Sequence, residues 1–257
     1  MKVGLVLEGG AMRGLFTAGV LDVFMERGVK FDGLIGVSAG ACFGCNYKSG
    51  QPGRVIRYNT RFCKDKRFCS FRSLLKTGDI FGADFCYNIV PKKLDIFDTK
   101  TFAESEMEFY VVCTNVETGK AVYHKCLTAD DRELTWMRAS ASMPLASHIV
   151  EVDGYKLLDG GISDSIPLRF IEKMGYERNG VILTQPRSYR KGKSHSLPLI
   201  KAAMRKYPEF VKASARRSKM YNKQLDYVKN AESFPVDTIG DFLDVASFES
   251  NLPLLVL

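Results

Sequence analysis

The sequence predicts an α/β fold, a three-layer α/β/α sandwich in which a mostly parallel central sheet lies between two layers of helices. Three observations support this prediction. Short apolar runs of strand length alternate with longer stretches of helical periodicity. Two of these runs lead through glycine-rich turns directly into a helix, as strands do in βαβ units. The chain has 257 residues, of which 46% are hydrophobic, so it can bury the core that such a sandwich needs.

The first expected strand and helix flank a glycine-rich loop. The apolar run 3–8 predicts a buried strand, and a helix over 14–27 keeps one face mostly apolar and ends at Gly28. Between them lie Gly9, Gly10, Ala11, Met12, Arg13 and Gly14. Such a loop presents unobstructed backbone N–H groups to an anion. That anion is either the phosphate of a cofactor or the oxyanion of an acyl-transfer intermediate.

The second expected strand and helix enclose a serine. Residues 31–37 form an apolar strand that runs into Gly-Val-Ser-Ala-Gly, and a helix is expected over 38–49. Gly-x-Ser-x-Gly is the nucleophile-elbow pattern, in which the serine occupies a strained turn at the end of a strand. Gly36 and Gly40 remove the side chains that would clash there. Ser38 is therefore a candidate nucleophile, although five-residue patterns also recur by chance.

A dinucleotide-binding unit begins with the same order of strand, glycine loop and helix. It also needs an acidic residue at the end of its second strand, where the carboxylate binds the ribose hydroxyls. The only acid near the second strand is Asp32, which lies at its start. The sequence therefore argues against nucleotide binding, and we expect no cofactor.

The remaining elements complete the sheet and its cover. Strands are expected over 107–114, 120–124 and 180–184, and a helix over 132–141. Residues 54–100 are basic, aromatic and irregular. We expect this region to form either a lid or acyl-chain groove, or peripheral helices packed by their aromatic side chains.

A second candidate for chemistry is an acidic turn. Asp159-Gly160-Gly161 follows the apolar residues 156–158 and would hold a carboxylate at a strand end with little bulk around it. The alternative is a plain turn, which we expect at Asp153-Gly154. Asp164 also competes, but it lacks the following glycines.

The three histidines fit no triad of the α/β-hydrolase order, in which a histidine follows the acid. His124 lies in an alternating strand, and His148 precedes the acidic turn in the chain. His195 follows it but lies in a polar, basic loop. We expect structural or solvent-exposed roles for all three.

Taken together, the glycine loop, the serine elbow and Asp159-Gly160-Gly161 resemble the motifs of the patatin-like phospholipase family. The stretch 138–144 also resembles a block that this family places shortly before its aspartate. The resemblance covers roughly residues 3–167. One departure is visible, since the third glycine of the family's loop is Ala11 here. An alanine narrows the allowed backbone angles and puts the geometry of one oxyanion donor in doubt.

The resemblance implies a patatin-like catalytic domain over residues 1–230. Its activity would be the hydrolysis of carboxylic esters in phospholipids or lysophospholipids, through an acyl-enzyme and without metal or cofactor. Ser38 would be the nucleophile and Asp159 the base, with no histidine. The glycine loop would bind the oxyanion, and we expect Arg13 to brace it. A general carboxylesterase, or a regulatory protein of this fold without turnover, remains open.

The cysteines and the amino terminus bear on location. Seven cysteines, an odd number without a secretory signal, are expected to be free thiols in a soluble, cytoplasmic protein. Cys42 and Cys45 have metal-like spacing, but they fall on the helix behind Ser38. We expect them to pack in the core rather than bind metal.

The net charge of +8 is concentrated near the carboxyl terminus. Residues 187–229 hold thirteen lysines and arginines against two acids, and an amphipathic helix is expected beyond Pro208. Its apolar face either packs on the core or rests peripherally on an anionic membrane. No recognition motif for nucleic acid accompanies the charge. The tail 231–257 departs from the family pattern, and the sequence leaves open whether it packs on the same domain.

Overall fold

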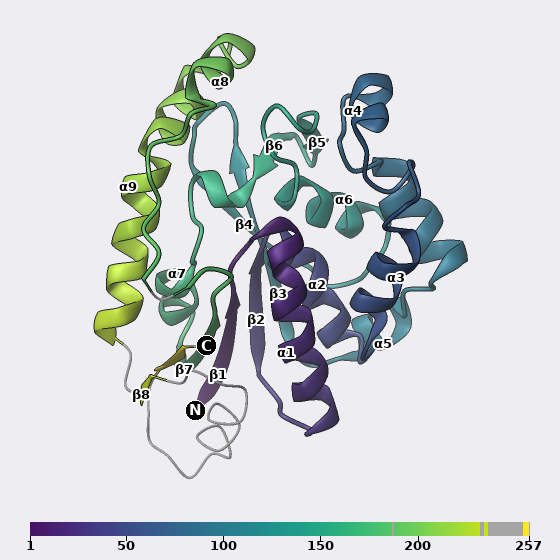
Figure 1. The fold of residues 1–257 in the computed structure, drawn as a ribbon. Coiled ribbons are helices and arrows are strands. Elements are labelled where there is room, and N and C mark those ends of the chain that lie inside the picture. Colours follow the sequence, from purple (N-terminus) through teal and green to yellow (C-terminus); the bar gives the residue numbers. More distant parts are fainter. Residues whose placement is uncertain (187, 232–233, 236–253, 257) are drawn as a thin grey trace.

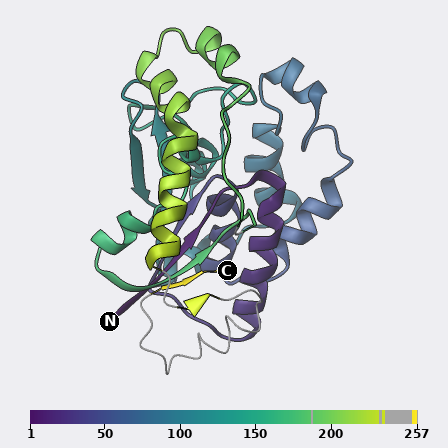
Figure 2. The same ribbon diagram turned by 60° about the vertical axis from the view of Figure 1, so that its left-hand side comes forward.

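A mixed β-sheet forms the middle layer of the fold, with helices on both of its faces (Figure 1, Figure 2). The computed structural model describes residues 1–186, 188–231, 234–235 and 254–256. Along the sheet the strands follow the order β5-β6-β3-β2-β1-β7-β9-β8, and β4 also pairs with β3. The three-layer α/β/α fold class expected from the sequence is confirmed.

The parallel part of the sheet is built from the motif-bearing strands. β1 (Lys2–Leu7) pairs in parallel with β2 (Gly33–Val37) and with β7 (Tyr176–Ile182), and β2 pairs in parallel with β3 (Glu108–Asn115). The carboxyl ends of these strands therefore meet at one end of the molecule, which is the upper end in Figure 1. Ligands of open α/β sheets bind at that end.

The antiparallel part lies beyond β3. It consists of β4 (Ala121–Lys125), β5 (Val150–Val152) and β6 (Tyr155–Asp159). Asp153 and Gly154, both with positive φ, form the turn between β5 and β6. The turn expected there is confirmed.

Alternating residues of each strand contact the two helical layers. Leu5 and Leu7 of β1 lie in a core cluster with α1 (Gly14–Glu26), α2 (Ala39–Lys48) and α6 (Asp131–Ser140). Val6 points the other way, into a cluster with α7 (Leu168–Lys173) and α9 (Pro208–Ala231). Burial on both faces is why these strands are apolar throughout.

The region 54–100 adds a helical lobe beside α1 and α2. It contains α3 (Arg54–Phe62), α4 (Phe71–Thr77), the π-type helix η2 (Phe85–Leu94) and α5, which begins at Thr99 and ends at Glu104. Phe62, Phe68 and Phe85 are buried together in this lobe. The aromatic residues therefore pack peripheral helices, one of the two expected outcomes.

The basic carboxyl-terminal stretch forms α8 (Leu197–Ala203) and the long helix α9. Phe210, Tyr221 and Leu225 of α9 are buried, so its apolar face packs on the core. No described helix has both the length and the apolar character needed to cross a bilayer.

Part of the tail 231–257 joins the same sheet. β9 (Leu254–Val256) pairs in parallel with β7, and β8 (Phe234–Pro235) pairs with β9. The rest of the tail lies outside the described residues. A domain boundary at residue 230 stays a prediction.

Candidate active site

Ser38 occupies the turn between β2 and α2 in a strained conformation. Its φ is 55° and its ψ is −121°, a region that L-residues rarely adopt. The turn is tight enough to require both flanking glycines. A Cβ on Gly36 would lie 2.5 Å from the Gly40 carbonyl oxygen, and one on Gly40 would lie 2.5 Å from the Leu7 carbonyl oxygen. These glycines allow the strained turn at the end of a central strand.

The strained serine is held from behind by the end of α6. The Ser38 backbone N–H donates to Ser140 Oγ at 3.0 Å, and Ser140 Oγ donates to the Val112 carbonyl at 2.6 Å. The Asp159 N–H donates to the Ser142 carbonyl at 2.7 Å. The same short segment thus fixes the backbones of both candidate catalytic residues. Ser140 and Ser142 belong to the stretch 138–144.

The glycine loop lies directly against the serine. A Cβ on Gly9 would come within 2.7 Å of Ser38 Cβ, and one on Gly14 within 2.9 Å of Ala39 Cβ. A Cβ on Gly10 would lie 2.5 Å from Thr184 Oγ1. These glycines therefore permit a close approach of the loop to the elbow.

Ala11 is the exception to this glycine pattern. It begins the short helix η1 (Ala11–Arg13) with a φ of 48°, in the left-handed region that favours glycine. Holding an alanine there costs roughly 1–2 kcal/mol. Ala11 thus adopts an angle that glycine would adopt more easily. Ala11 and Met12 are exposed and line a cavity in front of Ser38.

Arg13 is exposed at the end of η1. Its backbone N–H donates to the Gly10 carbonyl at 3.0 Å and closes the loop. Its positive charge lowers the pKa of Lys191. No contact of its guanidinium with the loop backbone is seen among the described residues, so the expected bracing by its side chain stays a prediction.

Asp159 ends β6 and is 1% exposed. Its Oδ1 accepts the Gly161 N–H at 2.8 Å, whereas the buried Oδ2 accepts no hydrogen bond of good geometry within the described structure. Burial raises the pKa of Asp159, and the charge of Arg217 and the nearby Ser38 hydroxyl oppose that rise. Gly160 is required because a Cβ there would lie 2.1 Å from the Val112 carbonyl oxygen. A buried carboxylate with a free oxygen therefore lies next to the serine.

Two basic residues from the carboxyl-terminal third lie beside this carboxylate. Arg217 of α9 donates from Nε to the Gly161 carbonyl at 2.7 Å. Burial and the charge of Arg217 lower the pKa of Lys191 to about 8, while Glu8 and Asp159 oppose that fall. Sequence reasoning did not single out Arg217 or Lys191, because only the distant pairing of α9 with the aspartate turn gives them their position.

Glu8 and Thr184 support the loop from below. Glu8 is buried, which raises its pKa, and it accepts the Thr184 N–H at 2.7 Å. Thr184 Oγ1 in turn donates to the Gly9 carbonyl at 2.9 Å. The end of β1 and the residues after β7 are thereby joined under the glycine loop.

Asp164, the competing acid, has a different set of partners. Its carboxylate accepts the Tyr123 hydroxyl at 2.6 Å and the Gln224 side-chain amide at 2.5 Å. Both of its oxygens are thus used in tying β4 and α9 together. Because both oxygens already accept hydrogen bonds, Asp164 is suited to a structural role rather than to that of a base.

The three histidines have separate surroundings. His124 Nε2 is 2.6 Å from Glu133 Oε2, and its ring stacks on Trp136. His148 pairs with Asp79 at 3.5 Å, and His195 is exposed. None of them hydrogen-bonds to Ser38 or Asp159 in the described part of the chain.

His124 also lies near Cys126 and Glu133, and one ligand atom of each falls within 4.8 Å of the others. These residue types suit a zinc-like cation. However, His124 of β4 and Glu133 of α6 already satisfy each other by a hydrogen bond, which joins the strand to the start of the helix. We interpret the group as structural.

An apolar cavity of about 440 Å³ opens beside Ser38. Its walls come from α2, the helical lobe 54–100 and α6, so this lobe is both an aromatic-packed cover and the wall of a groove. The lining includes Ser38, Cys42, Tyr58, Phe68, Tyr87 and Met137. Burial raises the pKa of the Cys42 thiol to about 11, and its Sγ lies 3.4 Å from the Tyr87 hydroxyl. Cys42 is therefore a neutral wall residue, and all seven cysteines are free thiols.

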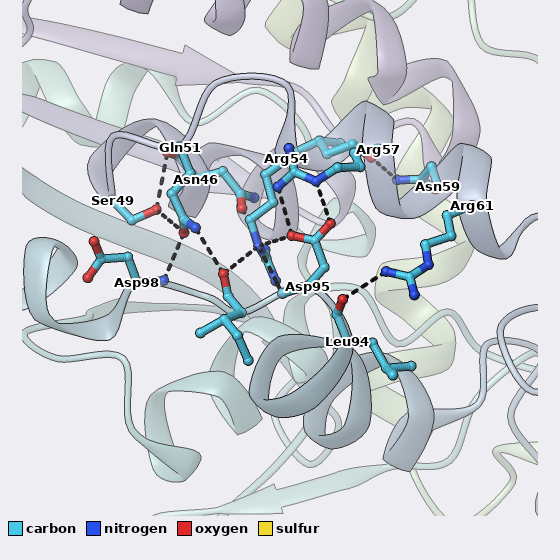
Figure 3. Close-up of polar contacts among 12 residues, drawn as sticks. Asn46, Ser49, Gln51, Arg54, Arg57, Asn59, Arg61, Leu94, Asp95 and Asp98 are labelled. Carbon is cyan, nitrogen blue, oxygen red and sulfur yellow. Dashed lines mark hydrogen bonds and ion pairs between the residues drawn. The ribbon is translucent and has the colours of Figure 1, made fainter.

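Arg54 is a charged residue in the wall of this cavity and is held by a network of polar contacts (Figure 3). Its guanidinium donates to Asn46 Oδ1 at 2.7 Å and pairs with Asp95 at 3.3 Å. Arg57 binds the same carboxylate at 2.7 Å. This network joins α2 and α3 to the end of η2, and the Asp95 carboxylate offsets one of its two positive charges.

Comparison with known proteins identifies the family of the chain. A family model described as patatin-like phospholipase matches residues 5–170. The chain is 32% identical over 193 residues to the uncharacterized protein YjjU of Escherichia coli, a match covering 72% of this chain and 52% of YjjU. It is 30% identical over 186 residues to lysophospholipase nte1 of Aspergillus niger, covering 68% of this chain and 11% of that protein.

A patatin-like phospholipase domain-containing protein of Caenorhabditis elegans, ZK370.4, is 26% identical over 182 residues, covering 67% of this chain and 13% of its own length. The chain thus spans about half of YjjU and about a tenth of the other two relatives. The matched region contains the glycine loop, the serine elbow and the aspartate turn. The chain belongs to the patatin-like phospholipase family.

Proposed function

We propose that this protein is a serine acyl hydrolase that cleaves carboxylic ester bonds of lipids through a dyad of Ser38 and Asp159. Membership of a phospholipase family supports the hydrolysis of lipid esters in general. The observation that carries the proposal is the position of Ser38, between a buried carboxylate and an apolar cavity. A nucleophile needs a base on one side and room for substrate on the other.

In the first step, Asp159 accepts the proton of the Ser38 hydroxyl as Oγ attacks the ester carbonyl. The raised pKa of Asp159 brings its basicity closer to what proton transfer at neutral pH requires. Collapse of the tetrahedral intermediate releases the alcohol, which takes the proton from Asp159, and leaves an acyl-enzyme. A water molecule, activated by the same carboxylate, then hydrolyses the acyl-enzyme.

The glycine loop would stabilise the oxyanion of each tetrahedral intermediate. Gly10, Ala11 and Met12 carry the N–H groups that we assign to this role, since the loop lies against Ser38. The Ser38 N–H itself is already bound to Ser140 Oγ. A donor of this kind contributes on the order of 3 kcal/mol to catalysis.

The cavity suggests which part of a substrate binds where. A long acyl chain matches its apolar walls, since burial of methylene groups drives such binding. Arg13, Lys191 and Arg217 lie near the dyad and would favour an ester whose alcohol portion carries a phosphate. We therefore propose a phospholipid or lysophospholipid as substrate. The name lysophospholipase, printed for a relative, is consistent with this class.

A fluorophosphonate probe tests the nucleophile directly. We expect the wild-type protein to be labelled and Ser38→Ala to remain unlabelled. Labelling of neither protein would favour a regulatory protein without turnover, an alternative suggested by Ala11 in the glycine loop. His195→Ala should keep ester hydrolysis nearly intact, and its loss would point to an ordinary triad.

Substrate preference separates a lipase-type enzyme from a general carboxylesterase. Hydrolysis should be compared for phospholipids, lysophospholipids and short-chain esters at matched concentrations. We expect kcat/KM to rise with acyl length until the cavity is filled. A rate that does not depend on acyl length would favour a general carboxylesterase.

The location of the protein is part of the same proposal. We propose a cytoplasmic protein that contacts anionic membranes peripherally, with the basic 187–229 region contributing. Because the apolar face of α9 is buried, this helix would contribute charge rather than an inserted surface.

A further inference from the structure

Exposed apolar side chains are concentrated at the end of the molecule where the candidate active site lies. They belong to the glycine loop, the start of α1, α4, the segment after α6, and α8. The residues are Met12, Phe16, Phe71, Leu75, Leu145 and Leu199, each between 41% and 88% exposed. Figures 1 and 2 both place α4 and α8 at this upper end, on either side of it. Exposed apolar groups gathered in this way indicate an interaction site.

The helix α4 presents the most exposed pair. Phe71 is 78% and Leu75 is 88% exposed, and they lie four residues apart on the same face. Ser73 of the same helix is buried. The apolar side of α4 thus faces outward, whereas a surface helix normally turns that side to the core.

The same helix is fixed to the rim of the cavity. Ile80, just after α4, donates its N–H to the Ala146 carbonyl at 2.8 Å, and Asp79 Oδ1 accepts the His148 N–H at 2.8 Å. Asp79, Ile80 and His148 all line the cavity. A surface that binds α4 would therefore lie at the cavity mouth.

The charge around these apolar residues is positive. Arg72 and Lys76 are exposed between and beside Phe71 and Leu75. On α8 and just after it, Lys201, Arg205 and Lys206 are exposed near Leu199. Apolar side chains interleaved with cations match the interface of a bilayer with anionic head groups.

We infer that α4 and α8 form a docking surface for an anionic lipid bilayer, with Phe71 and Leu75 inserted among the lipids. In this orientation the mouth of the cavity faces the membrane, and a lipid can reach Ser38 without crossing bulk water. The inference rests on the proposed function, because docking brings lipid to Ser38 only if the protein hydrolyses lipid esters. Its test does not depend on turnover.

Binding is measured with the Ser38→Ala protein, so that lipid is not consumed. Sedimentation with vesicles of phosphatidylcholine containing phosphatidylglycerol should carry the protein down, and vesicles of phosphatidylcholine alone should carry down far less. Phe71→Ser with Leu75→Ser should weaken partition into the anionic vesicles by about tenfold or more, because each side chain loses a buried apolar surface. Arg72→Gln with Lys76→Gln should weaken it and reduce its salt dependence.

A matched control comes from exposed apolar residues at the opposite end. Leu127 follows β4, which runs antiparallel to β3, and Met174 precedes β7. They are 65% and 44% exposed. Leu127→Ser with Met174→Ser should leave vesicle binding unchanged. The inference would be overturned if Phe71→Ser with Leu75→Ser bound the anionic vesicles as well as the Ser38→Ala protein that carries neither change. It would also be overturned if that Ser38→Ala protein did not bind the vesicles.

A second readout follows the depth of α4 directly. Leu75→Trp adds an exposed indole to a chain whose single tryptophan, Trp136, is buried. Its emission should shift to shorter wavelength with anionic vesicles, and an unchanged spectrum would contradict insertion. Hydrolysis of a water-soluble short ester, measured with Ser38 intact, should be the same with and without the α4 substitutions. Failure of the proposed function would appear as no ester hydrolysis by the wild-type protein, whatever the vesicle result.

Discussion

Arg217 of α9 is joined to Gly161 by a hydrogen bond of 2.7 Å, from its guanidinium Nε to the backbone carbonyl. The N–H of the same glycine binds Asp159 at 2.8 Å. A cation is thereby held beside the carboxylate through one glycine residue, and no direct ion pair between Arg217 and Asp159 is seen among the described residues. The long basic helix thus contributes to the candidate active site as well as to the outer layer.

Arg217→Gln tests this arrangement through the pH profile. The charge of Arg217 lowers the pKa of Asp159, so its removal should raise that pKa further. A base must be ionised to work, and activity is lost as the pH falls through its pKa. The acidic limb of kcat/KM should therefore move to higher pH. Arg216→Gln removes an exposed neighbouring charge and should leave the acidic limb of kcat/KM in place. Equal shifts of this limb in both variants would contradict a specific role of Arg217.

Asp159→Asn should lower kcat by about 100-fold to 10,000-fold, since the amide cannot accept the serine proton. Asp164→Asn is the matched control, because Asp164 is a buried acid that binds Tyr123 and Gln224 instead. It should lower thermal stability more than turnover. Ester hydrolysis and thermal unfolding of both variants separate the two roles. A catalytic loss as large for Asp164 as for Asp159 would contradict the assignment.

Ser140→Ala should misplace the nucleophile. The variant leaves the partly buried Ser38 N–H without its acceptor, at a cost of about 1–3 kcal/mol in the free energy of unfolding. We expect kcat to fall while binding of a non-reactive lipid analogue changes little. Ser142→Ala removes a hydroxyl that donates to the Arg138 carbonyl, but it keeps the backbone carbonyl that binds Asp159. It should retain most activity, and urea unfolding gives the stability of both variants.

Ala11→Gly should change kcat by less than about threefold. Ala11 already has the positive φ that a glycine would adopt, so the substitution adds no new oxyanion donor. In the free energy of unfolding, relief of backbone strain, roughly 1–2 kcal/mol, is partly offset by the greater freedom of glycine in the unfolded chain, roughly 0.4–1 kcal/mol. Steady-state kinetics with a short ester measure the effect. A gain of tenfold or more would mean that alanine impairs the loop.

The alternating strands and helices of the first 49 residues could be predicted because local patterns determine them. Strands β1 and β2 are short, continuous apolar runs, helices α1 and α2 are longer stretches that follow them, and glycines mark the turns between them. The helices of the 54–100 lobe were not resolved from the sequence. Helix α4 has seven residues and α5 has six, and the π-type helix η2 contains Pro91, so these elements are too short or too irregular to show a helical period in the sequence.

Residues that act on the site from a distance were beyond sequence reasoning for a related reason. Arg217 lies 56 positions from the glycine that it binds, and nothing around it distinguishes it from Arg216. Glu8 was expected only as the last residue of a strand, although its buried carboxylate binds Thr184, two residues after the end of β7. Such roles depend on which strands become neighbours. The motif residues Ser38 and Asp159, in contrast, have glycines beside them that mark a demanding local geometry.

Because Ser140 and Ser142 fix the backbones of Ser38 and Asp159 from one helix end, the separation of the two side chains depends little on the chain that connects them. Insertions or deletions elsewhere between residues 38 and 159 can therefore accumulate in descendants without pulling the pair out of alignment. The helical lobe 54–100 could therefore be redesigned for a new substrate, provided that the carboxyl end of α6 is left unchanged.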